Sequence, residues 1–216
     1  MASAIRLRSA VALLGRFPAL AGVDLDVAPG EVVHVQGPNG AGKTSLLRAC
    51  AGLLPVVAGE AVVLGHDLRC DRRAVRRRIG LLGHAGFLYD DLTVVDNVRF
   101  AVRAGRGDEG RVEGTLARLG LDGRLRDVGV GRLSAGQRRR TALAAVVARD
   151  PDLWLLDEPH AGLDAEARAT VDAVLLDAAA RGATVVLASH EPVSVADRVV
   201  RVVGGHVRAE ERVGVA

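Results

Sequence analysis

Aromatic residues and lysine are scarce in this chain of 216 residues. Three Phe, one Trp and one Tyr make up 2% of the sequence, too few for the stacking surfaces on which single-stranded nucleic acids are bound. Of the 29 basic residues, 28 are arginine and only Lys43 is lysine. Because arginine supplies every other positively charged side chain, we expect Lys43 to have a chemical role that arginine cannot fill.

Cysteine and long uncharged stretches are scarce as well. Cys50 and Cys70 are the two cysteines, and their spacing suggests neither a metal site nor a disulfide framework. We therefore expect a reducing cytoplasm and two packing residues. The longest stretches without a charged side chain have 11 residues, whereas a membrane-spanning helix needs ~20. We expect no segment that crosses a membrane alone.

The chain does have the balance of a globular protein, with 49% hydrophobic and 25% charged residues. Its net charge of +3 is small and predicts no strong electrostatic field. Two arginine-rich runs, at 72–78 and 138–140, could contact nucleic acid. Without aromatic residues between them, we interpret both runs as solvated faces.

The order of the predicted elements indicates an α/β fold. A buried strand is predicted from Glu31 to Gln36, a glycine-rich turn from Gly37 to Gly42, and a helix from Lys43 to Ala51. Thr93 to Asp96 has the capping-box pattern, and helical spacing continues from Glu109 to Leu119, so we expect a helical insert. The chain opens with short β-rich segments at Ile5–Arg8 and Val23–Val27. Further strands are predicted at Ala61–Leu64, Ile79–Leu82, Leu153–Asp157, Thr184–Ser189 and Val199–Val203, with helices between several of them, which indicates a mostly parallel sheet.

The glycine-rich turn carries the most specific chemical signal. It fits the pattern G-x-x-x-x-G-K-[ST] between a predicted strand and a predicted helix, the context that this pattern requires. Backbone N–H groups and the helix N-terminus would surround a polyphosphate, Lys43 would reach its β and γ oxygens, and Thr44 would ligate Mg²⁺. The predicted binding residues are Gly37, Pro38, Asn39, Gly40, Ala41, Gly42, Lys43, Thr44 and Ser45.

Two carboxylates follow the apolar strand that begins at Leu153. The carboxyl edge of an open α/β sheet is where nucleotides bind, so Asp157 and Glu158 are predicted to lie near the phosphates. We expect Asp157 to hold Mg²⁺, through water, and Glu158 to orient or deprotonate an attacking water. An Asp-Glu pair alone more often marks the start of a helix. We favour the catalytic interpretation here because the same chain also contains the glycine loop that begins at Gly37.

The segment Leu133-Ser134-Ala135-Gly136-Gln137 has the S-x-x-Q form of a capping box, and by itself it predicts only the start of a helix. Together with the glycine loop and the carboxylates it resembles the signature of the ABC-type ATPases, which is usually Leu-Ser-Gly-Gly-Gln. The resemblance extends over nearly the whole chain, and the motifs occur in the same order as in the family. The resemblance implies one P-loop NTPase domain over 1–216, with an N-terminal antiparallel β portion, a RecA-like core at about 1–84 and 150–216, and a helical subdomain at about 85–149.

In such ATPases two nucleotide-binding domains stack head to tail around two ATP molecules. The signature of one domain then covers the γ-phosphate held by the glycine loop of the other. The resemblance implies that His190 contacts the γ-phosphate and the attacking water, and that Asp164 belongs to the D-loop. The residues implied to face the partner's nucleotide are Ser134, Ala135, Gly136 and Gln137.

Two departures from the family pattern affect the expected site. The family's Mg²⁺-contacting glutamine is missing, because Ala85 stands at the aligned position; His84 or a water is the hypothesised substitute. The aromatic residue that usually stacks on adenine corresponds to Leu14, with Phe17 three residues later as a possible replacement. Weak stacking leaves GTP and other nucleotides open as substrates.

The run GPNGAGKTSLLR at 37–48 and the LSAGQ form of the signature resemble the haem-export ATPases of cytochrome c biogenesis. This resemblance implies an ATP-hydrolysing subunit at the cytoplasmic face of the cell membrane, paired with a second ATPase subunit, identical or not, and with an integral membrane permease. The alternative is a soluble ABC ATPase that acts on nucleic acid or the ribosome. Such proteins usually carry tandem sites or inserted arms, so we favour transport and expect no nucleic-acid partner.

Overall fold

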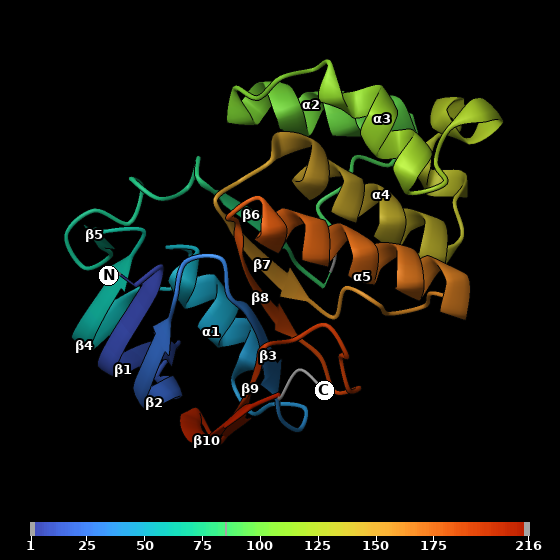
Figure 1. Ribbon diagram of the computed structural model, residues 1–216. Helices are drawn as coiled ribbons and strands as arrows, with labels where there is room; N and C mark the ends of the chain where they lie inside the picture. The colour runs from blue at the N-terminus through green and yellow to red at the C-terminus, as the bar shows by residue number, and fades with distance from the viewer. Residues whose placement is uncertain (1–2, 85, 214–216) are drawn as a thin grey trace.

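The computed structural model describes residues 3–84 and 86–213, and its largest feature is a six-stranded sheet (Figure 1). The strand order is β10-β9-β3-β8-β7-β6, and all neighbours are parallel except β10, which runs antiparallel to β9. Because parallel strands end at one edge, the segments that follow β3, β7 and β8 lie together. The mostly parallel sheet is confirmed. Its strands are β3 (Val32–Gln36), β6 (Ile79–Leu82), β7 (Leu153–Asp157), β8 (Thr184–Ala188), β9 (Arg198–Val203) and β10 (His206–Arg212).

A second sheet of four antiparallel strands is formed mostly by the N-terminal part of the chain, in the order β2-β1-β4-β5. Its first strands are longer than expected, because a register shift in both pairings of β1 between Leu7 and Val11 breaks the alternation of buried and exposed residues at Ser9. The sequence therefore predicted only the regular ends. The strands are β1 (Ile5–Leu14), β2 (Phe17–Val27), β4 (Val56–Val63) and β5 (His66–Asp67).

Two buried clusters lie on opposite faces of the large sheet. Helix α1 (Lys43–Cys50) packs between the two sheets, in the cluster that includes Leu153 and Leu155 of β7 (Figure 1). The alternate residues Trp154 and Leu156 belong to the other cluster. Since successive side chains of a strand point to opposite faces and both faces are covered, β7 is buried along its whole length and apolar up to Leu156, with Asp157 at its end.

Helices cover the second face. The second cluster joins residues of α2 (Val94–Gly105), α3 (Arg111–Arg118), α4 (Ala135–Arg149) and α5 (Ala165–Ala180) to the sheet. The segment between α3 and α4 contains the short 3₁₀ helices η1 (Gly123–Asp127) and η2 (Val130–Arg132). The predicted cap of α2 is present, because the Asp96 N–H donates to the Thr93 hydroxyl at 3.2 Å. None of the helices in residues 3–84 and 86–213 combines the length with the apolar composition of a transmembrane span.

The expectation for the cysteines is half right. Cys50 is buried in the first cluster, where burial raises the pKa of its thiol to about 12. Cys70 is exposed and has no packing role.

Candidate active site

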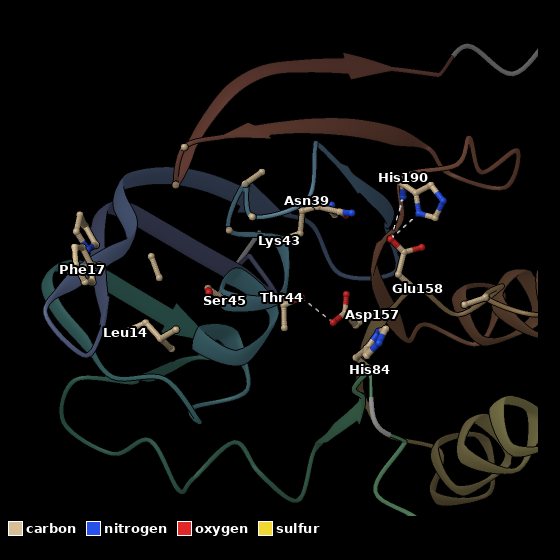
Figure 2. A pocket seen from close by; sticks show the side chains of 18 residues that line it. Leu14, Phe17, Asn39, Lys43, Thr44, Ser45, His84, Asp157, Glu158 and His190 are labelled. Atoms are coloured by element: carbon tan, nitrogen blue, oxygen red, sulfur yellow. Dashed lines mark hydrogen bonds and ion pairs between the residues drawn. The ribbon is translucent and has the colours of Figure 1, made fainter. Parts of the chain in front are cut away.

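An open cavity of about 910 Å³ lies at the carboxyl edge of the large sheet (Figure 2). It collects residues that are far apart in the sequence, from the loops after β3, β6, β7 and β8 and from the β1–β2 and β9–β10 turns. Gly37 and Pro38 line a neighbouring cavity instead. The large cavity is lined by Leu14, Phe17, Pro18, Ala19, Asn39, Gly40, Ala41, Gly42, Lys43, Thr44, Ser45, His84, Asp157, Glu158, Ala161, His190, Gly204 and Gly205.

The glycine loop curls around the amine of the single lysine. Gly42, the N-cap of α1, has φ of 108°, and a Cβ there would lie 2.8 Å from the Ala19 carbonyl oxygen, so only glycine fits. The Lys43 Nζ donates to the carbonyl oxygens of Gly37 at 2.7 Å and Pro38 at 3.2 Å. The ammonium group is thus held within the loop, where an anion bound by the backbone N–H groups would meet it.

The first residues of α1 and the last residue of β7 meet directly. The Thr44 hydroxyl donates to Asp157 Oδ2 at 2.8 Å, and Asp157 is 4% exposed. A hydroxyl and a carboxylate are hard oxygen ligands of the kind Mg²⁺ prefers, so the residues present fit this ion. No group of three or more His, Cys, Asp or Glu in the described part of the chain could hold a metal.

Glu158 lies on a strained stretch of backbone next to His190. It has a φ of 51°, in the left-handed region that non-glycine residues rarely adopt, and its N–H donates to the Ala188 carbonyl at 2.7 Å. The backbone N–H of His190 donates to Glu158 Oε1 at 3.2 Å, and His190 Nδ1 lies 3.1 Å from the same oxygen. The carboxylate therefore faces the cavity with the histidine beside it (Figure 2).

The segment Ser134 to Gln137 forms the predicted capping box. The Gln137 N–H donates to the Ser134 hydroxyl oxygen at 3.2 Å, and the Ser134 N–H donates to Gln137 Oε1 at 2.9 Å. A Cβ on Gly136 would lie 2.8 Å from the Gly162 carbonyl oxygen, so this segment packs against the turn that leads to α5. Asp164 caps α5 by accepting from the Ala167 N–H at 2.8 Å.

The predicted site residues therefore fall into two groups. Residues Asn39 to Ser45, both carboxylates and His190 line the large cavity, whereas Ser134 to Gln137 and Asp164 do not. His84 joins the first group and lies near Asp157 in Figure 2. Ala85 lies outside the described residues. Leu14 and Phe17 line the far end of the cavity with exposed fractions of 57% and 79%.

The interpretation of 138–140 as a solvated face is wrong. Arg138 pairs with Asp90 at 2.7 Å, and Arg140 donates to the carbonyls of Leu119 and Gly120. Arg139 is 8% exposed and donates to three backbone carbonyls at the ends of β6 and β7. The only hint in the sequence was the position of this arginine one turn into the helix that Ser134 starts. The run at 72–78 does expose its arginines, as expected.

His34, in β3 directly before the glycine loop, is a second buried group that the sequence did not single out as functional. It is 1% exposed, and its Nε2 lies 3.3 Å from the Ser189 carbonyl oxygen. Burial lowers the pKa of His34, although the Ser189 carbonyl and the Glu158 carboxylate act in the opposite direction. Burial therefore favours the neutral form of this imidazole.

Comparisons with known proteins agree with this geometry. The family model described as ABC transporter matches residues 20–161. The cytochrome c biogenesis ATP-binding export protein CcmA of Aromatoleum aromaticum is 43% identical over 173 residues, which are 79% of this chain and 80% of that protein. The CcmA of Bordetella bronchiseptica is 41% identical over 186 residues, 85% of this chain and 83% of that protein.

Among solved structures, a dimeric post-hydrolysis state of an ATP-binding cassette, bound to ADP and Pi, gives a TM-score of 0.88. Its identity to this chain is 26%, and the match covers 96% of this chain and 98% of that chain. The α/β cassette fold expected from the sequence is confirmed. The chain belongs to the ABC transporter family, as an ATP-binding and ATP-hydrolysing subunit.

Proposed function

We propose that the cavity binds ATP with Mg²⁺ and that the residues around it carry out hydrolysis. Lys43 and the backbone N–H groups of the loop bind the β- and γ-phosphates, while Thr44 and Asp157 would hold Mg²⁺. The bound ion would neutralise phosphate charge. Glu158 accepts a proton from the attacking water, and His190 orients that water and the γ-phosphate. The observation that carries this proposal is the convergence of Thr44, Asp157, Glu158 and His190 on one cavity.

We further propose that the active form is a dimer in which each signature segment, Ser134 to Gln137, covers the nucleotide of the other subunit, next to Asp164. The signature residues do not line the large cavity of their own chain, which leaves them available to a second one. The similar cassette bound to ADP and Pi is dimeric. Dimerisation is tested by gel filtration with and without ATP, and failure of ATP to shift the elution of the slow variant E158Q would refute it.

The dimer is proposed to drive an integral membrane permease from the cytoplasmic face of the membrane, in haem export for cytochrome c maturation. The name of the similar relatives, cytochrome c biogenesis ATP-binding export protein, supports this assignment. An exposed aromatic surface of Tyr89 and Phe100, whose rings lie 5.0 Å apart, supports docking, and Phe87 nearby in the sequence is exposed as well. We assign this surface to a helical subdomain at about 85–149.

Co-purification from detergent extracts tests the transport assignment. The chain should bring down a multi-span membrane protein, and the variant F100E should lose that partner while it still binds ATP. The exposed E113A variant on α3 serves as the matched control. Salt-sensitive binding of RNA or DNA in place of a membrane partner would overturn the assignment.

A further inference from the structure

Arg139 is a buried cation, and no carboxylate among residues 3–84 and 86–213 is bonded to it. Its Nε and Nη2 donate to the Glu158 carbonyl at 3.0 and 2.8 Å, Nη2 also donates to the Asp157 carbonyl, and Nη1 donates to the Gly83 carbonyl at 2.9 Å. Burial lowers the pKa of Arg139, while the charges of Asp157 and Glu158 raise it. One guanidinium thus joins α4 to the ends of β6 and β7.

Glu158, which accepts two of these four hydrogen bonds, has a strained backbone. The backbone of Glu158 has a φ of 51°, and such a conformation persists only where the surroundings hold it. Its N–H is fixed by the Ala188 carbonyl at 2.7 Å, and its carbonyl is fixed by Arg139. Arg139 does not line the large cavity, so it has no direct contact with the place where a nucleotide would bind.

We propose that Arg139 is a positioning residue that holds the Glu158 carboxylate in place from the signature helix. Because α4 begins one turn earlier at Ser134, the helix that would contact one ATP also fixes the catalytic carboxylate for the other. Arg139 thereby links the two composite sites of the dimer. This inference rests on the proposed function.

The geometry requires arginine and not merely a positive charge. A guanidinium presents several N–H donors in a fixed plane and can reach three carbonyls together, whereas the ammonium group of lysine is a point charge. Substitution should displace the Glu158 backbone without touching the nucleotide. A displacement of about 1 Å in a catalytic group can lower the rate by about 10²-fold.

The test compares R139Q, R139K and the control R140Q in the full chain. R139Q should lower kcat by about 10²-fold and leave the Kd for ATP unchanged, and R139K should fall between R139Q and the wild type. R140Q removes comparable bonds to the Leu119 and Gly120 carbonyls, which lie away from β7, and should keep the wild-type kcat.

A double-mutant cycle separates positioning from a general structural role. If Arg139 acts through Glu158, R139Q should not lower the residual rate of E158Q any further. Equal losses in both backgrounds, or a wild-type kcat in R139Q, would overturn the inference. Urea unfolding checks that the variants are folded, and R139K carries the same cycle if R139Q does not fold.

The outcomes also separate this inference from the proposed function. A wild-type chain that hydrolyses no ATP refutes the proposed function itself. A wild-type chain that hydrolyses ATP and depends on Glu158, but is indifferent to Arg139, refutes only the positioning role.

Discussion

The two helices that are proposed to face phosphate begin in different ways. Helix α1 starts after Gly42, which has no side chain to cap it, whereas α4 starts from a complete capping box between Ser134 and Gln137. The first N–H groups of α1 are therefore left for a ligand, while α4 satisfies part of its own N-terminus. We infer that α1 is the main phosphate anchor and that α4 contributes weaker contacts.

The positively charged side chains near the starts of the two helices also make α1 the stronger phosphate site. Lys43 stands at the start of α1 with its ammonium inside the glycine loop. The arginines near the start of α4 already have partners within the protein, because Arg138 pairs with Asp90 and Arg139 is bonded to Gly83, Asp157 and Glu158. Substitutions at the start of α1 should therefore weaken nucleotide binding, and substitutions at the start of α4 should impair dimerisation and hydrolysis after the nucleotide has bound.

The largest expected effect separates turnover from binding altogether. Glu158→Gln removes the proton acceptor but keeps a side chain of the same size, so kcat should fall by about 10²- to 10⁴-fold. Affinity for ATP should stay at the wild-type value, because Lys43 and the loop are untouched. Steady-state hydrolysis and equilibrium binding of a fluorescent ATP analogue measure the two quantities, and a parallel loss of affinity would contradict the assigned role.

Lys43 tests the α1 side of the comparison. Lys43→Ala should weaken ATP binding by about 10- to 100-fold, since bonds to charged groups contribute ~1.5–3 kcal/mol. Lys43→Arg distinguishes the shape of the side chain from its charge, because it keeps the positive charge and introduces the residue that supplies every other positively charged side chain of the protein. The planar guanidinium does not fit a loop that closes on a single ammonium, so it should bind ATP as poorly as the alanine variant. Isothermal titration measures both, and undiminished binding in Lys43→Ala would break the comparison.

Ser134 tests the α4 side. Ser134→Ala should keep ATP binding in the monomer, weaken the ATP-dependent dimer and lower kcat by about tenfold, the loss of one charge-assisted hydrogen bond. It also removes a helix cap, at a cost of about 1 kcal/mol in unfolding free energy. Ser134→Asp is the matched control: it restores the cap but places a negative charge against phosphate. If the aspartate variant dimerises with ATP as the wild type does, the serine acts only as a cap.

The sequence predicted the α1 side of the site more completely than the α4 side. The glycine loop, Asp157 and Glu158 follow from a local pattern placed between a strand and a helix, and the structure brings them to one cavity. The neighbours of Arg139 could not be predicted, because its acceptors at Gly83 and Glu158 are 56 and 19 residues away in sequence. Burial of a charge depends on such long-range contacts, which no local pattern encodes.

The strands show the same division between local and long-range information. β3 and β7 were predicted closely because they are buried along their length. β10 was missed because it is a mostly exposed edge strand with charged residues. Its available signal was the Gly204-Gly205 pair before it, a hairpin turn that joins β9 to β10.

The regions around α1 and α4 should also differ in how they affect the pH dependence of the free energy of unfolding. His34, beneath the glycine loop, has a folded pKa below its ordinary value of 6.5, so the unfolded chain takes up a proton that the folded chain does not. Stability should therefore fall as the pH drops below 6.5, by up to ~1.4 kcal/mol per pH unit. Urea unfolding of the wild type and His34→Gln at several pH values measures this, and equal slopes would contradict it. Arg139, on the α4 side, stays charged throughout.

The smallest expected effect concerns the base of the nucleotide. Leu14, Phe17, Pro18 and Ala19 line the far end of the cavity and offer no side-chain hydrogen-bonding group to a base. Sites that read a base or a substrate by hydrogen bonds discriminate by 10⁴- to 10⁵-fold, so the Kd values for ATP and GTP should differ here by about tenfold at most. Phe17→Ala should weaken both nucleotides by a similar few-fold factor, since stacking tolerates any base. Competition binding measures the ratio, and a strong preference for ATP would mean that backbone groups read the adenine edge. In that case the α1 side would supply specificity as well as phosphate affinity, and the contrast with α4 would be larger than the side chains alone indicate.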